Sequence, residues 1–258
     1  MPQPPTRYTS RIQKGGALLE EMRQLVLLWS DAPLAENRAE IIRSNPLNKA
    51  TRARIADVLN RVFIPRFVEG PIPNAWKLLR PLEELGPSLS IVRPVYFWLT
   101  ALAEPLMADL CTEFLCARRA SGLFSITTED AAAWVESKGS GWANVVNLKV
   151  TRAMLAALRD FGVLEGKAHK RLANQSLSPQ SFAWLAFCFH LNGRTGRKLL
   201  EHPDWRLFTM SPADVEHLFF ECHQMKLLEY HAAGSTIVLE FPASTPEEYA
   251  HVVARRQA

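Results

Sequence analysis

The hydrophobic positions of the chain recur mainly at the spacing of an α-helix. The first such run has the spacing i, i+4, i+7, i+8 and i+11 and consists of Leu18, Met22, Leu25, Val26 and Trp29. Alternation with a period of two is clearest in residues 227–231 and 236–241, on either side of Ala-Ala-Gly-Ser. That pattern predicts a β-hairpin, which should pack on the helix before it. We therefore predict a mainly α fold with a small C-terminal hairpin.

The segment 45–67 predicts a helix with one apolar and one basic face. Its apolar positions are Ile55, Val58, Leu59, Val62 and Phe63, either Asn48 or Thr51 can cap its start, and Ile64-Pro65 is expected to end it. Between Arg43 and Phe67 there are six basic residues and one acid. A helix, a short Asn-Pro break and a basic helix are typical of a helix-turn-helix. The residues predicted to contact DNA here are Lys49, Thr51, Arg52, Arg54, Arg61 and Arg66.

A second basic region follows the pattern of a winged helix. Thr127 or Thr128 begins a helix that ends near Glu136, and a second helix runs from about Asn144 to Phe161, where Gly162 ends it. A basic turn over 165–171 comes next. We expect the second helix to enter the major groove of DNA and the turn to lie on neighbouring phosphates. The predicted contacts are Lys149, Arg152, Arg159, Lys167, Lys170 and Arg171.

A change of pattern near Ala120-Ser-Gly122 predicts a division of the chain. We expect an N-terminal helical domain over residues 1–120, containing the first basic helix, and a winged-helix-like domain over 121–258 that ends in the hairpin. Basic and acidic residues are concentrated in different segments of the chain. The net charge is +4, but residues 149–171 hold six basic residues and two acids, while residues 199–258 hold nine acids and four basic residues. Such asymmetry favours an oriented electrostatic surface, although a solvated outer face of a helical bundle remains the alternative for segment 45–67.

The sequence gives little support to catalysis, metal binding or membrane insertion. Phosphate-loop, dinucleotide-binding, nucleophile-elbow and zinc-protease motifs are absent, and the four cysteines have no zinc-site spacing. The apolar segment 95–117 contains Glu104, Asp109 and Glu113, each costing roughly 2.5–3.5 kcal/mol in a bilayer. We read this segment as two soluble helices. The prediction is a cytoplasmic, non-enzymatic protein with reduced cysteines and no cofactor or metal.

Three short segments in the first 110 residues share one resemblance. They are Arg7-Tyr8-Thr-Ser10 with Lys14-Gly-Gly-Ala-Leu-Leu-Glu-Glu-Met-Arg23, Asn45-Pro-Leu-Asn-Lys-Ala-Thr-Arg-Ala-Arg54, and Ala103-Glu-Pro-Leu-Met-Ala-Asp109. Together they resemble the BrxA family of bacterial BREX phage-defence systems. The order and spacing of the segments carry the resemblance, which is strongest in the first 120 residues. Pro46 stands where the family usually has leucine.

This resemblance implies a non-enzymatic, largely helical protein with a NusB-like N-terminal part and winged-helix elements. It also implies binding to double-stranded DNA and association with other BREX proteins, including a DNA methyltransferase. Few Asn or Gln residues lie on the basic faces, so we expect mainly phosphate-backbone binding with weak sequence preference. Two alternatives remain open: an assembly subunit whose basic faces dock acidic proteins of the defence complex, and an RNA-binding protein.

Overall fold

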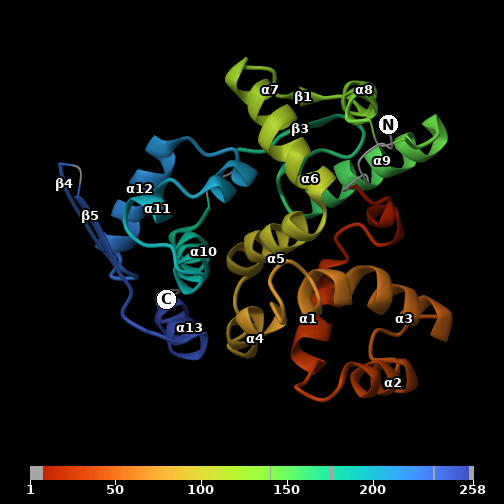
Figure 1. The fold of residues 1–258 in the computed structure, drawn as a ribbon, viewed down its shortest axis with the longest axis horizontal. Coiled ribbons are helices and arrows are strands. Elements are labelled where there is room, and N and C mark those ends of the chain that lie inside the picture. The colour runs from red at the N-terminus through yellow and green to blue at the C-terminus, as the bar shows by residue number, and fades with distance from the viewer. Residues whose placement is uncertain (1–7, 140, 175–176, 235, 256–258) are drawn as a thin grey trace, which may run out of the picture. The chain divides into compact units, whose positions relative to one another are not determined.

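Helices make up most of the fold, and the strands form two small antiparallel sheets (Figure 1). The computed structural model describes residues 8–139, 141–174, 177–234 and 236–255. Contacts group the chain into two units: residues 1–76 with 99–174, and residues 77–98 with 175–258. The boundary predicted at residue 120 falls within the first unit. The mainly α fold with a late hairpin is confirmed.

The first unit begins with helices packed around the residues that the sequence places on apolar faces. They are the 3₁₀-helix η1 (Arg11–Lys14), α1 (Leu19–Leu28), α2 (Leu34–Ser44), α3 (Arg52–Val58) and the π-helix η2 (Leu59–Val68). Met22, Leu25, Val26 and Trp29 are buried, as are all five predicted apolar positions of segment 45–67. Leu18 instead precedes α1 in a left-handed conformation.

The basic helix extends beyond the end predicted at Ile64-Pro65. After Val58 its backbone becomes π-helical and continues through Pro65 to Val68, with the amide of Glu69 donating to the carbonyl of Ile64 at 2.8 Å. Hydrogen bonds between residues five apart make a wider turn than those of an α-helix. The wider turn accommodates the ring of Pro65, which in an α-helix would clash with the carbonyl four residues earlier. The changed periodicity also rotates the residues after Val58 away from the phase of an α-helix.

The second half of the first unit combines short helices with a three-stranded sheet. Its elements are the last turn of α5 (Leu89–Ala103), α6 (Pro105–Asp109), the π-helix η3 (Leu110–Leu115), α7 (Cys116–Ala120), β1 (Ser125–Ile126), α8 (Thr128–Ser137), α9 (Asn144–Asp160), β2 (Leu164–Glu165) and β3 (Lys170–Leu172). The strand order is β1-β3-β2 and both pairings are antiparallel. Helices α8 and α9 pack on each other, and α9 packs on β2. The two helices of the predicted winged-helix pattern, α8 and α9, are confirmed within one residue at each end, whereas α5 begins six residues before the apolar segment predicted at 95–117.

The second unit is built around one helix that is apolar on all sides. Helix α10 (Pro179–Leu191) buries every residue from Ser181 to Phe189, so this stretch has no solvent-facing side. The reason is its central position, since neighbouring elements cover all of its sides. Phe182 stacks on Trp205 with ring centroids 4.4 Å apart, and Phe187 contacts Tyr249 at 4.3 Å. The surrounding elements are α4 (Trp76–Glu84), the first part of α5, α11 (Arg197–Leu200), the 3₁₀-helix η4 (Pro203–Phe208), α12 (Pro212–Gln224) and α13 (Pro246–Ala254).

The predicted hairpin is present in the second unit. Strands β4 (Glu229–Ala233) and β5 (Thr236–Glu240) pair antiparallel, and β4 packs on α12 as expected (Figure 1). The chain does not end there, however. Helix α13 follows, with Thr245 as its cap and Pro246 as its first residue. These are ordinary helix-start residues, so the sequence carried a signal that the hairpin interpretation overlooked.

The cysteines are all reduced, and their burial makes a test of the core. Cys111, Cys188 and Cys222 are buried, and burial raises the pKa of each thiol well above its ordinary value. Because the thiolate is the reactive form, we expect these three to resist alkylation in the native protein and to react on denaturation. Half-buried Cys116 is the internal comparison. Mass spectrometry after iodoacetamide treatment measures this, and rapid native labelling of the three would contradict the described packing.

Candidate nucleic-acid interface

Helix α9 presents two cations to solvent on one face. Lys149 and Arg152 are exposed, while Val150, Met154 and Leu158 on the other side are buried. Among the described residues, no acid lies within ion-pair distance of Lys149 or Arg152. The two charges are therefore available to an anionic partner.

The carboxyl end of α9 is fixed by a glycine cap. Gly162 has φ +79°. The amide of Val163 donates to the carbonyl of Leu158 at 2.8 Å, and the amide of Gly162 donates to the carbonyl of Arg159 at 2.9 Å. This is the complete Schellman pattern, which confirms the predicted cap. It turns the chain directly into β2, so the helix and the hairpin that follows are held together.

The β2–β3 hairpin carries three more of the predicted cations, Lys167, Lys170 and Arg171. Its turn requires Gly166, whose φ is +85° and where a Cβ atom would lie 2.0 Å from the carbonyl oxygen of His169. Lys167 is exposed at the turn, and the Nζ of Lys170 donates to the carbonyl of Lys167 at 3.0 Å. The turn that follows α9 and β2 in the sequence therefore carries an exposed lysine, Lys167.

Two of the predicted cations near α9 already have acidic partners. Arg171 pairs with Glu165 at 3.0 Å across β2 and β3, and Arg159 pairs with Asp160 at 2.6 Å. All four side chains are at least one-third exposed. Exposed pairs of this kind are worth about 0–1 kcal/mol, so a phosphate can replace the carboxylate at little cost.

In segment 45–67 most of the predicted contact residues are used within the fold. The hydroxyl of Thr51 caps α3 by accepting from the amide of Arg54 at 3.1 Å. Lys49 pairs with Glu21 at 2.7 Å, and the guanidinium of Arg54 donates to the carbonyl of Lys14 at 3.0 Å. The exposed cations of the set are Arg52 and Arg61, and Arg61 pairs with Asp57 at 2.9 Å.

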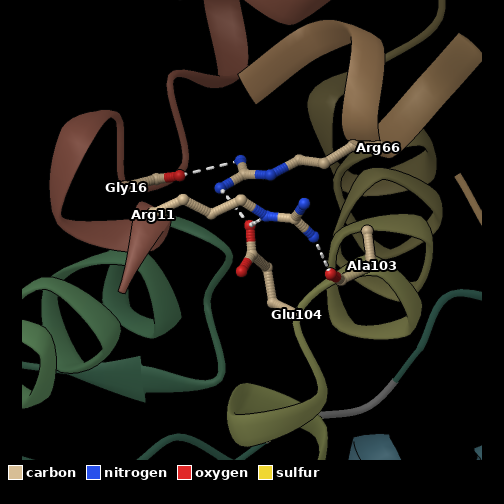
Figure 2. Close-up of polar contacts among 5 residues, drawn as sticks. All are labelled: Arg11, Gly16, Arg66, Ala103 and Glu104. Carbon is tan, nitrogen blue, oxygen red and sulfur yellow. Dashed lines mark hydrogen bonds and ion pairs between the residues drawn. The ribbon is translucent and has the colours of Figure 1, made fainter. Parts of the chain in front are cut away.

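Arg66 lies in the interior and must be removed from the predicted DNA-contacting set. Its side chain has 0% exposure, and its guanidinium donates to the carbonyl of Gly16 at 2.9 Å and to the Oε1 of Glu104 at 3.3 Å (Figure 2). Burial lowers the pKa of Arg66, and the Glu104 carboxylate acts in the opposite direction. A fully buried arginine cannot reach a phosphate in this conformation.

The cluster formed by Arg66, Glu104 and Arg11 joins three separate segments of the first unit. The Nε of Arg11 donates to the same Oε1 of Glu104 at 3.1 Å, and its Nη2 donates to the carbonyl of Ala103 (Figure 2). We call these three residues the buried clamp. It connects η1, η2 and the α5–α6 junction. Sequence reasoning missed it, although an acid between two helices of an apolar segment was a signal for a buried partner.

The described residues contain no group of three or more His, Cys, Asp or Glu side chains that could hold a metal ion. In the same residues, none of the helices combines the length and the apolar character needed to cross a membrane. Of the two predicted basic regions, α9 with the β2–β3 hairpin keeps more of its predicted cations exposed than segment 45–67 does.

The sequence of the chain matches a model of one known protein family. A model of the family described as BrxA matches residues 6–187, which is more than half of the chain. The chain belongs to the BrxA family. Membership points to a component of a BREX phage-defence system. No curated protein and no solved structure matches the chain.

The buried clamp lies where two of the BrxA-like segments of the sequence meet in the structure. The segments that begin at Arg7 and at Ala103 lie far apart in the chain, yet the hydroxyl of Tyr8 donates to the Oδ2 of Asp109 at 2.7 Å. Gly16 and Glu104, from the same two segments, both accept hydrogen bonds from Arg66. In this chain the two segments are therefore joined to each other within the first unit.

Proposed function

We propose that this protein is a non-enzymatic component of a BREX system that binds double-stranded DNA through α9 and the β2–β3 hairpin. The observation that carries the proposal is the exposed, unpaired pair Lys149 and Arg152 on the solvent face of α9. Most of the affinity comes from phosphates, so sequence preference is weak.

The order of the elements supports a winged-helix interpretation of this surface. A helix, β1, α8, α9, β2 and β3 follow one another, and β3 pairs with both other strands. In this arrangement α9 is the helix that would enter the major groove, which is about 12 Å wide and admits a helix about 10–12 Å across. The β2–β3 turn with Lys167 would then lie along a neighbouring phosphate strand.

The α3–η2 surface is the weaker candidate for the main DNA contact. Lys49 and Arg54 hold other parts of the fold, and Arg66 is buried. Arg52 and Arg61 remain exposed. They can add long-range attraction, which is screened over about 8 Å at physiological salt.

Fluorescence anisotropy tests the proposal with labelled duplex DNA, single-stranded DNA and duplex RNA of equal length. We expect duplex DNA to bind most tightly. About four phosphate contacts would weaken binding about 100-fold between about 50 and 200 mM salt, because bound counterions are released. Absence of duplex binding at the lower salt, or equal or tighter RNA binding, would overturn the proposal.

A further inference from the structure

The solvent face of α9 begins with an apolar side chain rather than with a charge. Val145 has 65% of its surface exposed, more than any other large hydrophobic residue among those described. It lies in the first turn of the helix, four residues before Lys149 and seven before Arg152. Residues with these spacings share one face of a helix, so the exposed valine and the two cations form a single stripe.

The dimensions of the stripe fit a helix that touches a base at one end and a phosphate at the other. Val145 and Arg152 are separated by about 10 Å along the axis, at 1.5 Å per residue. The major groove is about 12 Å wide. If Val145 contacts the base edges, Arg152 therefore lies close to the phosphate backbone at the side of the groove. The branched valine side chain has no donor or acceptor, and it can therefore recognise only an apolar group on a base edge.

We propose that Val145 recognises thymine by packing against its 5-methyl group in the major groove. The inference rests on the proposed DNA binding of α9 and adds a base preference to it. Thymine is the base that presents an apolar methyl group in that groove, and cytosine and the purines present polar atoms instead. Contact with one methyl group favours a thymine at the contacted position by about fourfold, which is the effect of burying one such group.

This preference is compatible with binding that depends mainly on phosphates. Lys149 and Arg152 supply attraction that is independent of sequence, whereas Val145 changes the affinity only modestly. The protein would therefore bind any duplex and favour sites with thymine under the first turn of α9.

Two duplexes that differ only in the methyl group test the inference. One alternates adenine and thymine, and the other alternates adenine and uracil. Wherever the protein binds along the duplex, the pyrimidines carry the 5-methyl group in the first and lack it in the second. The variants are Val145→Ser and, as a matched control, Leu123→Ser, which changes an exposed apolar residue outside α9. Affinities are measured by anisotropy at one salt concentration.

Wild type and Leu123→Ser should bind the thymine duplex about fourfold more tightly than the uracil duplex. Val145→Ser should bind both equally, with an affinity near that of wild type for the uracil duplex. Equal binding of both duplexes by wild type, or an unchanged ratio in Val145→Ser, would overturn the thymine contact and leave the proposed function standing. Failure of wild type to bind either duplex would overturn the proposed function itself.

Discussion

Replacing Glu104 by alanine is expected to destabilise the first unit by about 3–5 kcal/mol, the usual cost of removing one partner from a buried ion pair. The side chain of Glu104 is 4% exposed and its Oε1 accepts from both Arg66 and Arg11. Without it the guanidinium of Arg66, which has no exposed surface, keeps its charge without a counter-ion. Hydrogen exchange in peptides of the first unit measures the effect directly, since that unit can then be followed separately.

Two variants separate the buried clamp from ordinary surface pairing. Glu40→Ala removes the exposed partner of Arg43 and should cost less than about 1 kcal/mol. The double variant Glu104→Leu with Arg66→Met replaces opposite charges by apolar groups and should recover much of the loss. A cost for Glu104→Ala no greater than that for Glu40→Ala would show that the clamp does not hold the unit together.

Replacing Lys149 and Arg152 together by alanine is expected to weaken duplex binding about 60-fold at 0.1 M salt. Two lost phosphate contacts lower the slope of log affinity against log salt by about 1.8, which corresponds to that factor. Both side chains are exposed and project from the solvent face of α9, so folding should be preserved. Anisotropy titrations at several salt concentrations give the slope and the affinity, and circular dichroism checks the fold.

The matched control is Arg52→Ala with Arg61→Ala on the α3–η2 surface. It removes the same number of positive charges, but Arg61 is already paired with Asp57. We expect a change of less than about threefold, with the salt slope nearly unaltered. A larger loss from this pair than from Lys149 and Arg152 would move the main contact to segment 45–67.

The buried stripes, the start of α8 and the end of α9 were predictable because their signals are local. Ile55, Val58 and Phe63 follow helical spacing, and Gly162 and Thr127 occupy positions where a glycine cap and a side-chain cap are expected. Predictions from such signals need only a few neighbouring residues. This explains why α8 and α9 were located closely from the sequence.

Arg66 and Glu104 could not be placed because their partners are distant in the chain. Arg66 was included because it is one of six basic residues between Arg43 and Phe67, after the expected helix end at Ile64-Pro65, but η2 continues through it as a π-helix and buries its side chain. Glu104 was judged by its cost in a membrane, while its actual partners, Arg11 and Arg66, lie 93 and 38 residues away. The same limit applies to the two units, each of which joins segments that are not consecutive.

Photocrosslinking from two matched positions tests most directly which surface contacts DNA. Ala168 in the β2–β3 turn and Ala53 in α3 are both exposed, so a benzoyl-phenylalanine at either position leaves the core unchanged. After irradiation with a labelled duplex, we predict a covalent adduct from position 168 and little or none from position 53. An adduct from position 53 without one from position 168 would contradict the proposal that α9 and its hairpin form the DNA-binding surface.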